Sequence, residues 1–431
     1  MKSNDYYGTE KIVKILLSIA PPVMLAQLIQ ALYNIVDSLF VGRYSQSGLT
    51  ALSIIYPIQL LMIALSVGTG VGINTSIAHY LGIQKSEKAK MVASLATPLA
   101  LLLWILFALI FFFVMPFYAR VSTNSTQVIQ DIISYGRIVS VFSVGLFLES
   151  VYSKILQAYG DMKTPMFAQI VGAIVNIILD PILIFTLNLG VTGAAIATVI
   201  GQIIACLVVI KKAYVHSARL KDNFDEIKRI YKFGIPNIIM QSAYTFYILG
   251  LNLILSTFSD QAVTALGLFY KWQTFFFIPL GSLQTCMVPI VSYNWAANNY
   301  GRCKETLKIS LLIGIGLMCL GMACFELLPV QLLSFFSDDS QVIQIGVHGF
   351  HLIGSSFIPM VTSLIFPVFF QAIGSALKSS LLTLTRTVIC FVPLAFIFSR
   401  FGLYYFWFTF PVTEIVSTSL GFYFYKHLMI Q

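Results

Sequence analysis

Four acidic residues lie inside long apolar segments of this chain, where an unpaired charge is unfavourable. They are Asp37, Glu149, Asp180 and Glu414. A carboxylate removed from water is destabilised by several kcal/mol unless it is protonated, paired or bound to a cation. Ionisable groups in such segments are therefore candidates for proton transfer or cation binding.

Asp37 ends a polar stripe formed by Gln27, Gln30, Asn34 and Asp37, with Tyr33 at its border. Steps of three and four residues place these side chains on one face of a helix. A polar face inside a membrane must meet protein or water, because lipid offers it no hydrogen bonds. The stripe predicts an ion or substrate path, and a ladder of interhelical hydrogen bonds is the structural alternative.

Asp180 follows Asn176 by one helical turn and precedes Pro181. Proline has no N–H, so a backbone carbonyl one turn earlier loses its helical partner. A carboxylate, an amide oxygen and a free carbonyl are ligands that a hard cation accepts. Combined with Asp37, the same groups would also suit a proton. The next apolar segment offers Thr198 on a face of small residues.

Other charged residues carry weaker signals. Glu149 lies near Lys154, which predicts a local ion pair at the membrane surface. Glu414 has no evident partner in the sequence. Lys271 and Arg386 are expected to line a cavity or to extend toward the membrane surface.

The elements that must position these residues are transmembrane helices. The chain of 431 residues is 58% hydrophobic and only 10% charged, whereas soluble domains carry about 25% charged residues. Apolar segments long enough to cross a bilayer recur along it. They predict an all-α membrane protein with twelve spans, at about 14–41, 53–81, 92–115, 127–153, 165–187, 191–210, 233–258, 264–293, 308–328, 341–370, 379–399 and 404–425.

The basic residues predict the orientation. When alternate loops are assigned to two sides of a membrane, twenty of the 26 lysines and arginines fall on one side and Arg43, Arg120 and Arg400 on the other. Cytoplasmic loops are the ones rich in Lys and Arg, so both termini are expected in the cytoplasm. The net charge of +9 then needs no nucleic-acid partner. The first apolar segment is too long and too polar for a signal peptide.

The second half of the chain repeats the first at one constant offset. Pro22 pairs with Pro236, and 127–130 recurs as 341–344. The repeat predicts a six-helix lobe at 1–210, a cytoplasmic linker at 211–232, and a second six-helix lobe at 233–431. The alternating charges of the linker predict a short amphipathic helix on the membrane surface, with a solvated loop as the alternative. An even number of spans per half makes the repeats parallel, related by a pseudo-two-fold axis along the membrane normal. The match fails at the acids, because Asp37 maps to Leu251 and Asp180 to Leu394.

Enzyme motifs such as a P-loop, H-E-x-x-H or G-x-S-x-G are missing from the sequence. We expect no catalytic activity and no cofactor. The six cysteines form no C-x-x-C pair and are expected to pack as small apolar residues. Uphill transport without an ATP site would have to draw on an ion gradient.

The chain resembles the multidrug and toxic compound extrusion (MATE) family over essentially its whole length. The motifs that carry the resemblance are Pro22 with Val36–Gly42, Thr50–Ser53, Gly68–Gly72, Gln157–Pro165, Gly234-Ile235-Pro236 and Pro289–Arg302. The family implies a drug/cation antiporter with two six-helix lobes around a V-shaped cavity.

Members of one prokaryotic branch hold their cation in the N-terminal lobe. The matching positions here are Asp37, Asn176, Asp180, Ala194 and Thr198. The resemblance thus implies a coupling-ion site there for Na⁺ or H⁺, with Na⁺ held by Asp37, Asn176, Asp180 and Thr198. Another branch places acids on the seventh and tenth spans, where this chain has none.

Gln30 and Tyr33 match positions that face the drug cavity of the first branch, and Asn34 is grouped with them. We expect an alternating-access exporter of several cationic or aromatic drugs. A flippase for lipid-linked precursors is the alternative, and a membrane-embedded enzyme is a more distant one. The protein is expected to be a monomeric, multi-pass protein of the prokaryotic plasma (inner) membrane, with drugs and the lipid bilayer as partners.

Overall fold

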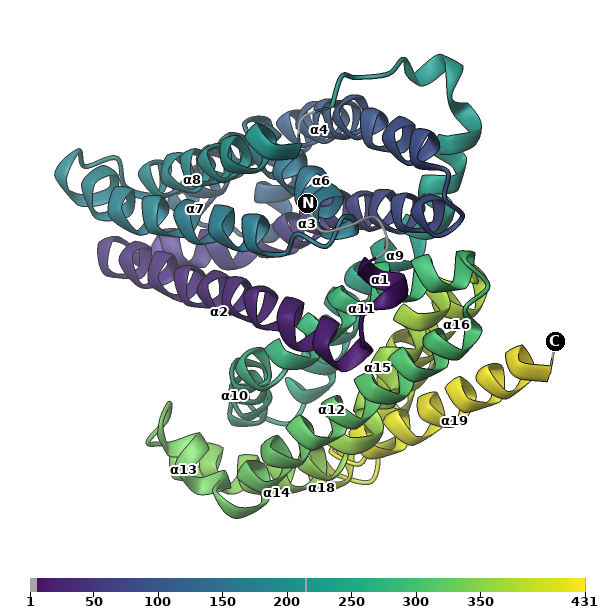
Figure 1. Cartoon of the computed structure of the whole chain (residues 1–431). Helices are drawn as coiled ribbons and strands as arrows, with labels where there is room; N and C mark the ends of the chain where they lie inside the picture. Colours follow the sequence, from purple (N-terminus) through teal and green to yellow (C-terminus); the bar gives the residue numbers. More distant parts are fainter. Residues whose placement is uncertain (1–5, 214, 431) are drawn as a thin grey trace. The chain divides into compact units, whose positions relative to one another are not determined.

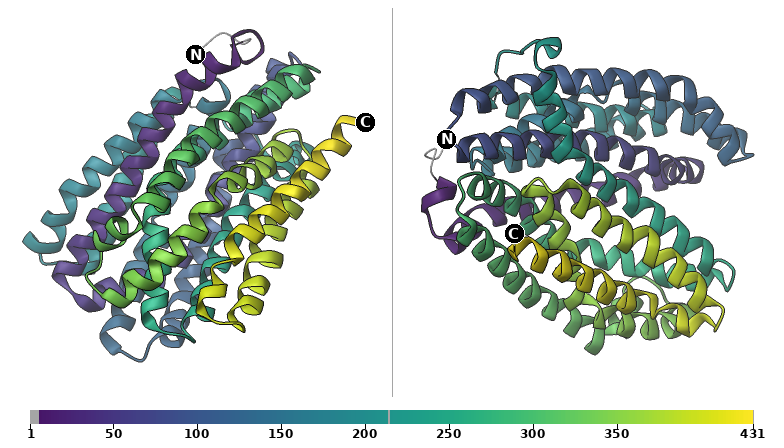
Figure 2. Two further views of the ribbon diagram at one scale, coloured as in Figure 1. Left: turned by 90° about the horizontal axis from the view of Figure 1, so that it is seen from below. Right: turned by 90° about the vertical axis from the view of Figure 1, so that its right-hand side faces the viewer.

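The computed structural model describes residues 6–213 and 215–430, which form helices joined mostly by short connections (Figures 1 and 2). Within those residues, eight helices are long and apolar enough to cross a membrane alone. Three further pairs of helices, bent by 43°, 50° and 55°, would bring the number of spans to eleven. The last two helices cover the remaining predicted span at 404–425. The all-helical class predicted from the sequence is confirmed.

The helices of the first half follow the predicted spans closely. They are α1 Tyr6–Thr9, α2 Ile12–Tyr44, α3 Gln46–Gly82, α4 Ser86–Ser122, α5 Thr126–Val141, α6 Val144–Ala158, α7 Lys163–Pro181 with a π-helical turn at Ile182–Thr186, and α8 Gly190–Ala213.

The second half repeats this order with more breaks. Its helices are α9 Phe224–Leu255, α10 Asp260–Phe276, α11 Ile278–Ala296, α12 Tyr300–Leu327, α13 Pro329–Ser334, α14 Ser340–Ser355, α15 Phe357–Ala372, α16 Ala376–Leu384 with a π-helical segment at Thr385–Phe391, α17 Val392–Ser399, α18 Leu403–Phe406 and α19 Thr409–Ile430.

The sequence repeat is visible in the helix boundaries. The bounds of α5 and of α14 differ by the same offset that separates Pro22 from Pro236, and both helices end at a bend. The single helix α3 corresponds to the bent pair α10–α11. Pro279 stands in that pair where α3 has Leu65. Since proline cannot donate the helical hydrogen bond, its position accounts for a break in only one of the two copies.

The chain divides into two compact units. One comprises Met1–Ile238 and Ser292–Asn298, and the other comprises Ile239–Val291 and Asn299–Gln431. The first unit therefore includes the start of α9 and the end of α11. Ser292 Oγ donates to the carbonyl of Thr75 at 2.9 Å. Asn294 Nδ2 donates to the carbonyl of Tyr7 at 3.0 Å.

The linker is tied to the first unit by polar contacts. Lys212 Nζ lies 2.6 Å from Asp161 Oδ2, and the backbone N–H of Ala218 donates to the carbonyl of Ser94 at 3.1 Å. Burial opposes the charge of Asp161, but hydrogen bonds from Lys212 and Thr164 outweigh it and lower the pKa of that carboxyl.

The short amphipathic helix expected in the linker does not form as such. A 3₁₀ turn at Leu220–Asp222 precedes α9, which begins nine residues before the predicted span and takes up the end of the basic segment. Glu226 and Arg229 on this extension both hydrogen-bond the hydroxyl of Tyr80. Attachment to α3 thus takes the place of a separate surface helix.

In the first unit, α7 and α8 cross with their backbones in close contact (Figure 1). A Cβ atom on Gly172 would lie 2.8 Å from the carbonyl oxygen of Gly201, and a Cβ on Gly201 would lie 2.7 Å from that of Gly172. Only glycine permits this approach. Asn176 and Thr198, each about one helical turn from the crossing, are thereby placed on facing helices.

In the second unit, a buried ion pair joins the π-helical segment to α19. Arg386 Nη2 lies 2.6 Å from Glu414 Oε1, and Arg386 Nε donates to the same oxygen at 3.0 Å. Ser363 Oγ donates to the other oxygen of Glu414. Glu414 is fully buried and Arg386 is 5% exposed. The structure therefore supplies the partner for Glu414 that the sequence did not reveal.

Replacing Gly201 with alanine should destabilise the protein by about 1–3 kcal/mol, because the added methyl group forces the α7 backbone away. The measurement is the thermal melting temperature of the purified protein in one detergent. Gly316→Ala is the matched control, since nothing lies within 4 Å of a Cβ at that position. Equal melting temperatures for the two variants would contradict the close crossing.

Replacing Arg386 with methionine should destabilise the protein by about 3–5 kcal/mol, because Glu414 would keep a buried charge without its partner. The double variant Arg386→Met/Glu414→Gln should recover much of this loss in the same melting assay. Arg400→Met removes an exposed arginine that lies over Phe396 and should cost about 1 kcal/mol or less. A single variant at Arg386 as stable as the wild type would show that the pair contributes nothing.

Candidate functional site

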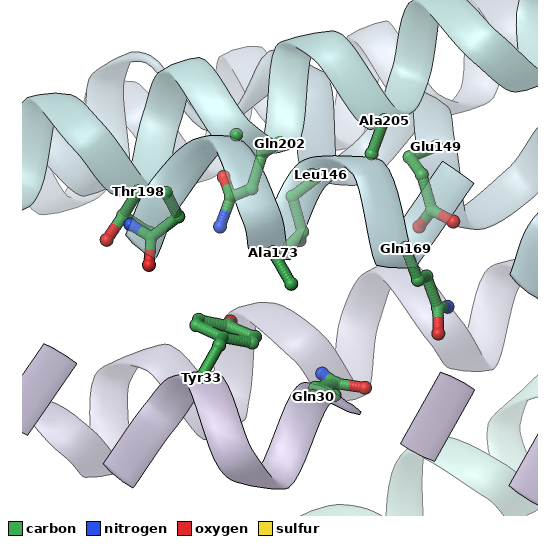
Figure 3. Close-up of a pocket in the computed structure, with 12 residues that line it drawn as sticks. Gln30, Tyr33, Leu146, Glu149, Gln169, Ala173, Thr198, Gln202 and Ala205 are labelled. Atoms are coloured by element: carbon green, nitrogen blue, oxygen red, sulfur yellow. The ribbon is translucent and has the colours of Figure 1, made fainter. Parts of the chain in front are cut away.

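A cavity lies within the first unit, among α2, α6, α7 and α8 (Figure 3). About 100 Å³ of it is open to the centres of water molecules. One water needs roughly 10–15 Å³ by this measure, so several can enter. The lining residues are Gln30, Tyr33, Leu146, Glu149, Gln169, Gly172, Ala173, Asn176, Thr198, Gly201, Gln202 and Ala205.

The two acids singled out from the sequence are buried and belong to one site. Asp180 is fully buried and Asp37 is 7% exposed. Asp37 lies on α2 and Asp180 on α7, and these two helices pack against each other. Asn176, one turn before Asp180, lies with its Nδ2 3.5 Å from Asp180 Oδ1 and also lines the cavity. The site therefore adjoins the cavity through α7.

Several oxygen atoms of this site are buried without a hydrogen-bond partner in the described part of the chain. They are Asp37 Oδ1, Asn176 Oδ1, Asp180 Oδ2 and Thr198 Oγ1. Buried polar atoms are normally paired, so four unpaired oxygens from α2, α7 and α8 indicate a place for a ligand that provides positive charge or protons.

The backbone near Asp180 departs from the α-helix. Pro181 cannot donate a hydrogen bond, and the chain continues as a π-helical turn in which Leu187 N donates to the carbonyl of Ile182 at 2.9 Å. Such turns are frequent at functional sites. Pro181 predicted a backbone carbonyl without its helical hydrogen bond, but no signal in the sequence indicated the π-helical turn that follows.

The donor atoms at this site are oxygens. No group of three or more His, Cys, Asp or Glu side chains able to hold a metal ion occurs in the residues described. Carboxylate, amide and hydroxyl oxygens suit a hard cation such as Na⁺. The two interacting carboxylates equally suit a proton.

The remaining predicted positions fall in different places. Gln30 and Tyr33 line the cavity, as their helical spacing indicated. Ala194 is fully buried one turn before Thr198 on α8. Asn34 is exposed on α2 and is not among the lining residues. It follows Tyr33 directly, so the helix turns its side chain by about 100° from that of Tyr33.

Sequence reasoning missed the place of Glu149 in the cavity. The predicted surface ion pair with Lys154 is replaced by other partners: Ser153 Oγ donates to Glu149 Oε1 at 2.6 Å, and Lys154 Nζ donates to Gln157 Oε1 at 2.9 Å. A signal was present in the facing helices, because small and polar residues recur at helical spacing as 169, 172, 173, 176 on α7 and 198, 201, 202, 205 on α8.

Comparison with known proteins identifies the family. The MatE family model matches residues 22–182 and 236–397, and the two matches begin at the paired positions Pro22 and Pro236. The multidrug export protein MepA of Staphylococcus aureus (strain MSSA476) is 26% identical over 420 residues, covering 94% of this chain and 91% of MepA.

Two solved structures share the fold. They are described as "Crystal structure of MATE in the straight conformation" (TM-score 0.91, 23% identity) and "Crystal structure of MATE in the bent conformation" (TM-score 0.92, 22% identity). In each case the match covers 98% of this chain and 97% of the other. With both halves matched by the family model, this chain belongs to the MatE family of membrane transporters.

Proposed function

We propose that this protein exports drugs of several kinds from the cell in exchange for Na⁺ or H⁺. The observation that carries the proposal is the group of unpaired buried oxygens on Asp37, Asn176, Asp180 and Thr198, placed next to a cavity of the same unit. The name of the S. aureus relative, a multidrug export protein, supports the drug as cargo.

In this mechanism, a cation from outside binds between Asp37 and Asp180 and is held also by Asn176 and Thr198, with Ala194 packed beside it. Its single positive charge offsets one of the two negative charges and so relieves the repulsion between the two carboxylates, which lie on different helices. The first span, α2, can then move relative to α7, and Pro21 and Pro22 are points where it lacks helical hydrogen bonds. Release of the cation inside resets the transporter.

A change of conformation is consistent with this fold, since two structures that share it are described as MATE in the straight conformation and MATE in the bent conformation. The mechanism requires that the cation and the drug prefer different conformations. The two lobes, 1–210 and 233–431, would alternate access to the two sides of the membrane around the linker 211–232.

The proposed orientation places both termini in the cytoplasm, on the side that receives twenty of the 26 basic residues. We propose a monomer in a bacterial plasma membrane. The alternative cargo, a lipid-linked pyrophosphate, would require basic side chains in the cavity to bind its phosphate groups. None of the described residues lining the cavity of the first unit is lysine or arginine, and one is glutamate, which favours cationic drugs.

Replacing Asp37 or Asp180 with asparagine should abolish coupling but leave drug binding intact, because asparagine keeps the shape and removes the titrating, cation-binding charge. Purified variants in liposomes are expected to show gradient-driven drug efflux below about a tenth of wild type. Asp131→Asn is the matched control in the same unit, outside the cavity. Undiminished efflux by both site variants would exclude this coupling site.

The coupling ion is identified by driving the same liposomes in two ways. One arm imposes a Na⁺ gradient at constant pH, and the other imposes a pH gradient without Na⁺. We expect one arm to drive efflux strongly in wild type and neither arm to drive it in Asp180→Asn. Failure of both gradients to drive efflux in the wild type would contradict antiport.

A further inference from the structure

We propose that Glu149 forms a second, separate cation subsite in the cavity of the first unit, which binds the ammonium or iminium group of an aromatic drug. This inference rests on the proposed export function and adds to it the residue that selects the charge of the cargo. The subsite consists of Glu149 with Gln169 beside it, and the aromatic ring of Tyr33 faces the same cavity (Figure 3).

The carboxylate of Glu149 has room for a ligand. Its Oε1 accepts one hydrogen bond, from Ser153 on the same helix at 2.6 Å. A carboxylate can accept about four hydrogen bonds, so one neutral hydroxyl leaves most of its capacity for Gln169 and a ligand. The ammonium of Lys154 donates to Gln157 Oε1 at 2.9 Å.

The subsite is distinct from the proposed coupling site. Gln169 lies seven residues before Asn176 on α7, and Ala205 lies seven residues after Thr198 on the facing α8. At about 1.5 Å per residue, the layer of Gln169 and Ala205 is about 10 Å from the layer of Asn176 and Thr198. Figure 3 shows Glu149 and Thr198 at opposite ends of the cavity, with Tyr33 between them. A coupling ion and a drug cation can therefore bind at different ends.

The composition of the cavity fits an aromatic cation. Leu146, Ala173 and Ala205 offer apolar contact, and Tyr33 can stack against a ring or lie over a positive charge. Gln30 and Gln202 add amide oxygens, which a positive ligand can approach without repulsion. Among the described lining residues Glu149 is the ionisable acid, so it supplies the formal charge for recognition.

The position of the subsite suggests when it acts. Along their helices, Glu149 and Gln169 lie closer than Asp180 does to the turn between α6 and α7, which carries Asp161 and is followed by Lys163 at the start of α7. In the proposed orientation this turn is cytoplasmic. A drug cation arriving from the cytoplasm would meet Glu149 before the coupling site, so Glu149 would serve loading rather than coupling.

The test compares a fixed cation with its uncharged parent ring, ethidium and phenanthridine, binding to purified full-length protein in detergent at pH 8. Ethidium binding is followed by fluorescence, and phenanthridine by displacement of ethidium. In Glu149→Gln, the affinity for ethidium should fall about tenfold or more, as expected for a charge-assisted contact. The affinity for phenanthridine should change less than about twofold. Selectivity for charge is a readout that a merely structural residue would not alter.

Two control variants sharpen the result. Glu149→Asp keeps the charge and should retain most of the selectivity for ethidium. Glu87→Gln removes an exposed acid of the same unit that pairs with Lys90 at 2.8 Å and should leave both affinities unchanged. Equal losses for ethidium and phenanthridine in Glu149→Gln, or no loss for either, would overturn the cation subsite while leaving the export function standing. A wild-type protein that binds neither compound would overturn both.

Discussion

A charge buried away from water must be neutralised, and the two halves of this chain meet that requirement in different ways. In the second unit, Arg386 and Glu414 neutralise each other through short, direct hydrogen bonds. In the first unit, Asp37 and Asp180 have no such basic partner among the hydrogen bonds and ion pairs of the described residues, and each retains an unpaired oxygen. A permanent internal partner fixes a structure, whereas a missing one leaves a position that a mobile cation or proton can fill.

The close crossing of α7 and α8 brings together two of the helices that carry the unpaired oxygens. Lipid gives helices little hydrophobic reason to associate, so tight packing at small residues must hold them together. Gly172 and Gly201 bring the two backbones together, and one turn away on each helix Asn176 and Thr198 line the same cavity. The same spacing, continued along both helices, lines a cavity with small and polar residues. A single pattern of small and polar residues on α7 and α8 therefore accounts for both the packing of the two helices and the lining of the cavity.

Much of this could be predicted from the sequence, because membrane helices are specified locally. The apolar segments and the constant offset of the repeat predicted the order and approximate positions of the helices, although several helices begin or end up to nine residues beyond the predicted spans. The Asp37 stripe indicated a polar face. Pairings between distant helices were not accessible. Arg386 and Glu414 belong to different elements, with the helices α17 and α18 between them in the chain. Glu149 was predicted to pair with its sequence neighbour Lys154, whereas the structure places it in the cavity. The sequence indicates that a buried charge needs a partner, but the partner can be identified only from the folded structure.

The repeat explains why one unit can specialise. A duplicated scaffold carries the same helix order twice, so the polar residues of one copy can change without removing the architecture. Leu251 is fully buried where the first copy has Asp37, and Leu394 stands at the counterpart of Asp180. The second copy thus has no acid to titrate at these positions, and its own buried acid is locked to an arginine. In the proposed mechanism, changes of charge on binding a cation would then be confined to the first unit, and one coupling site would avoid competition between two copies for the same ion.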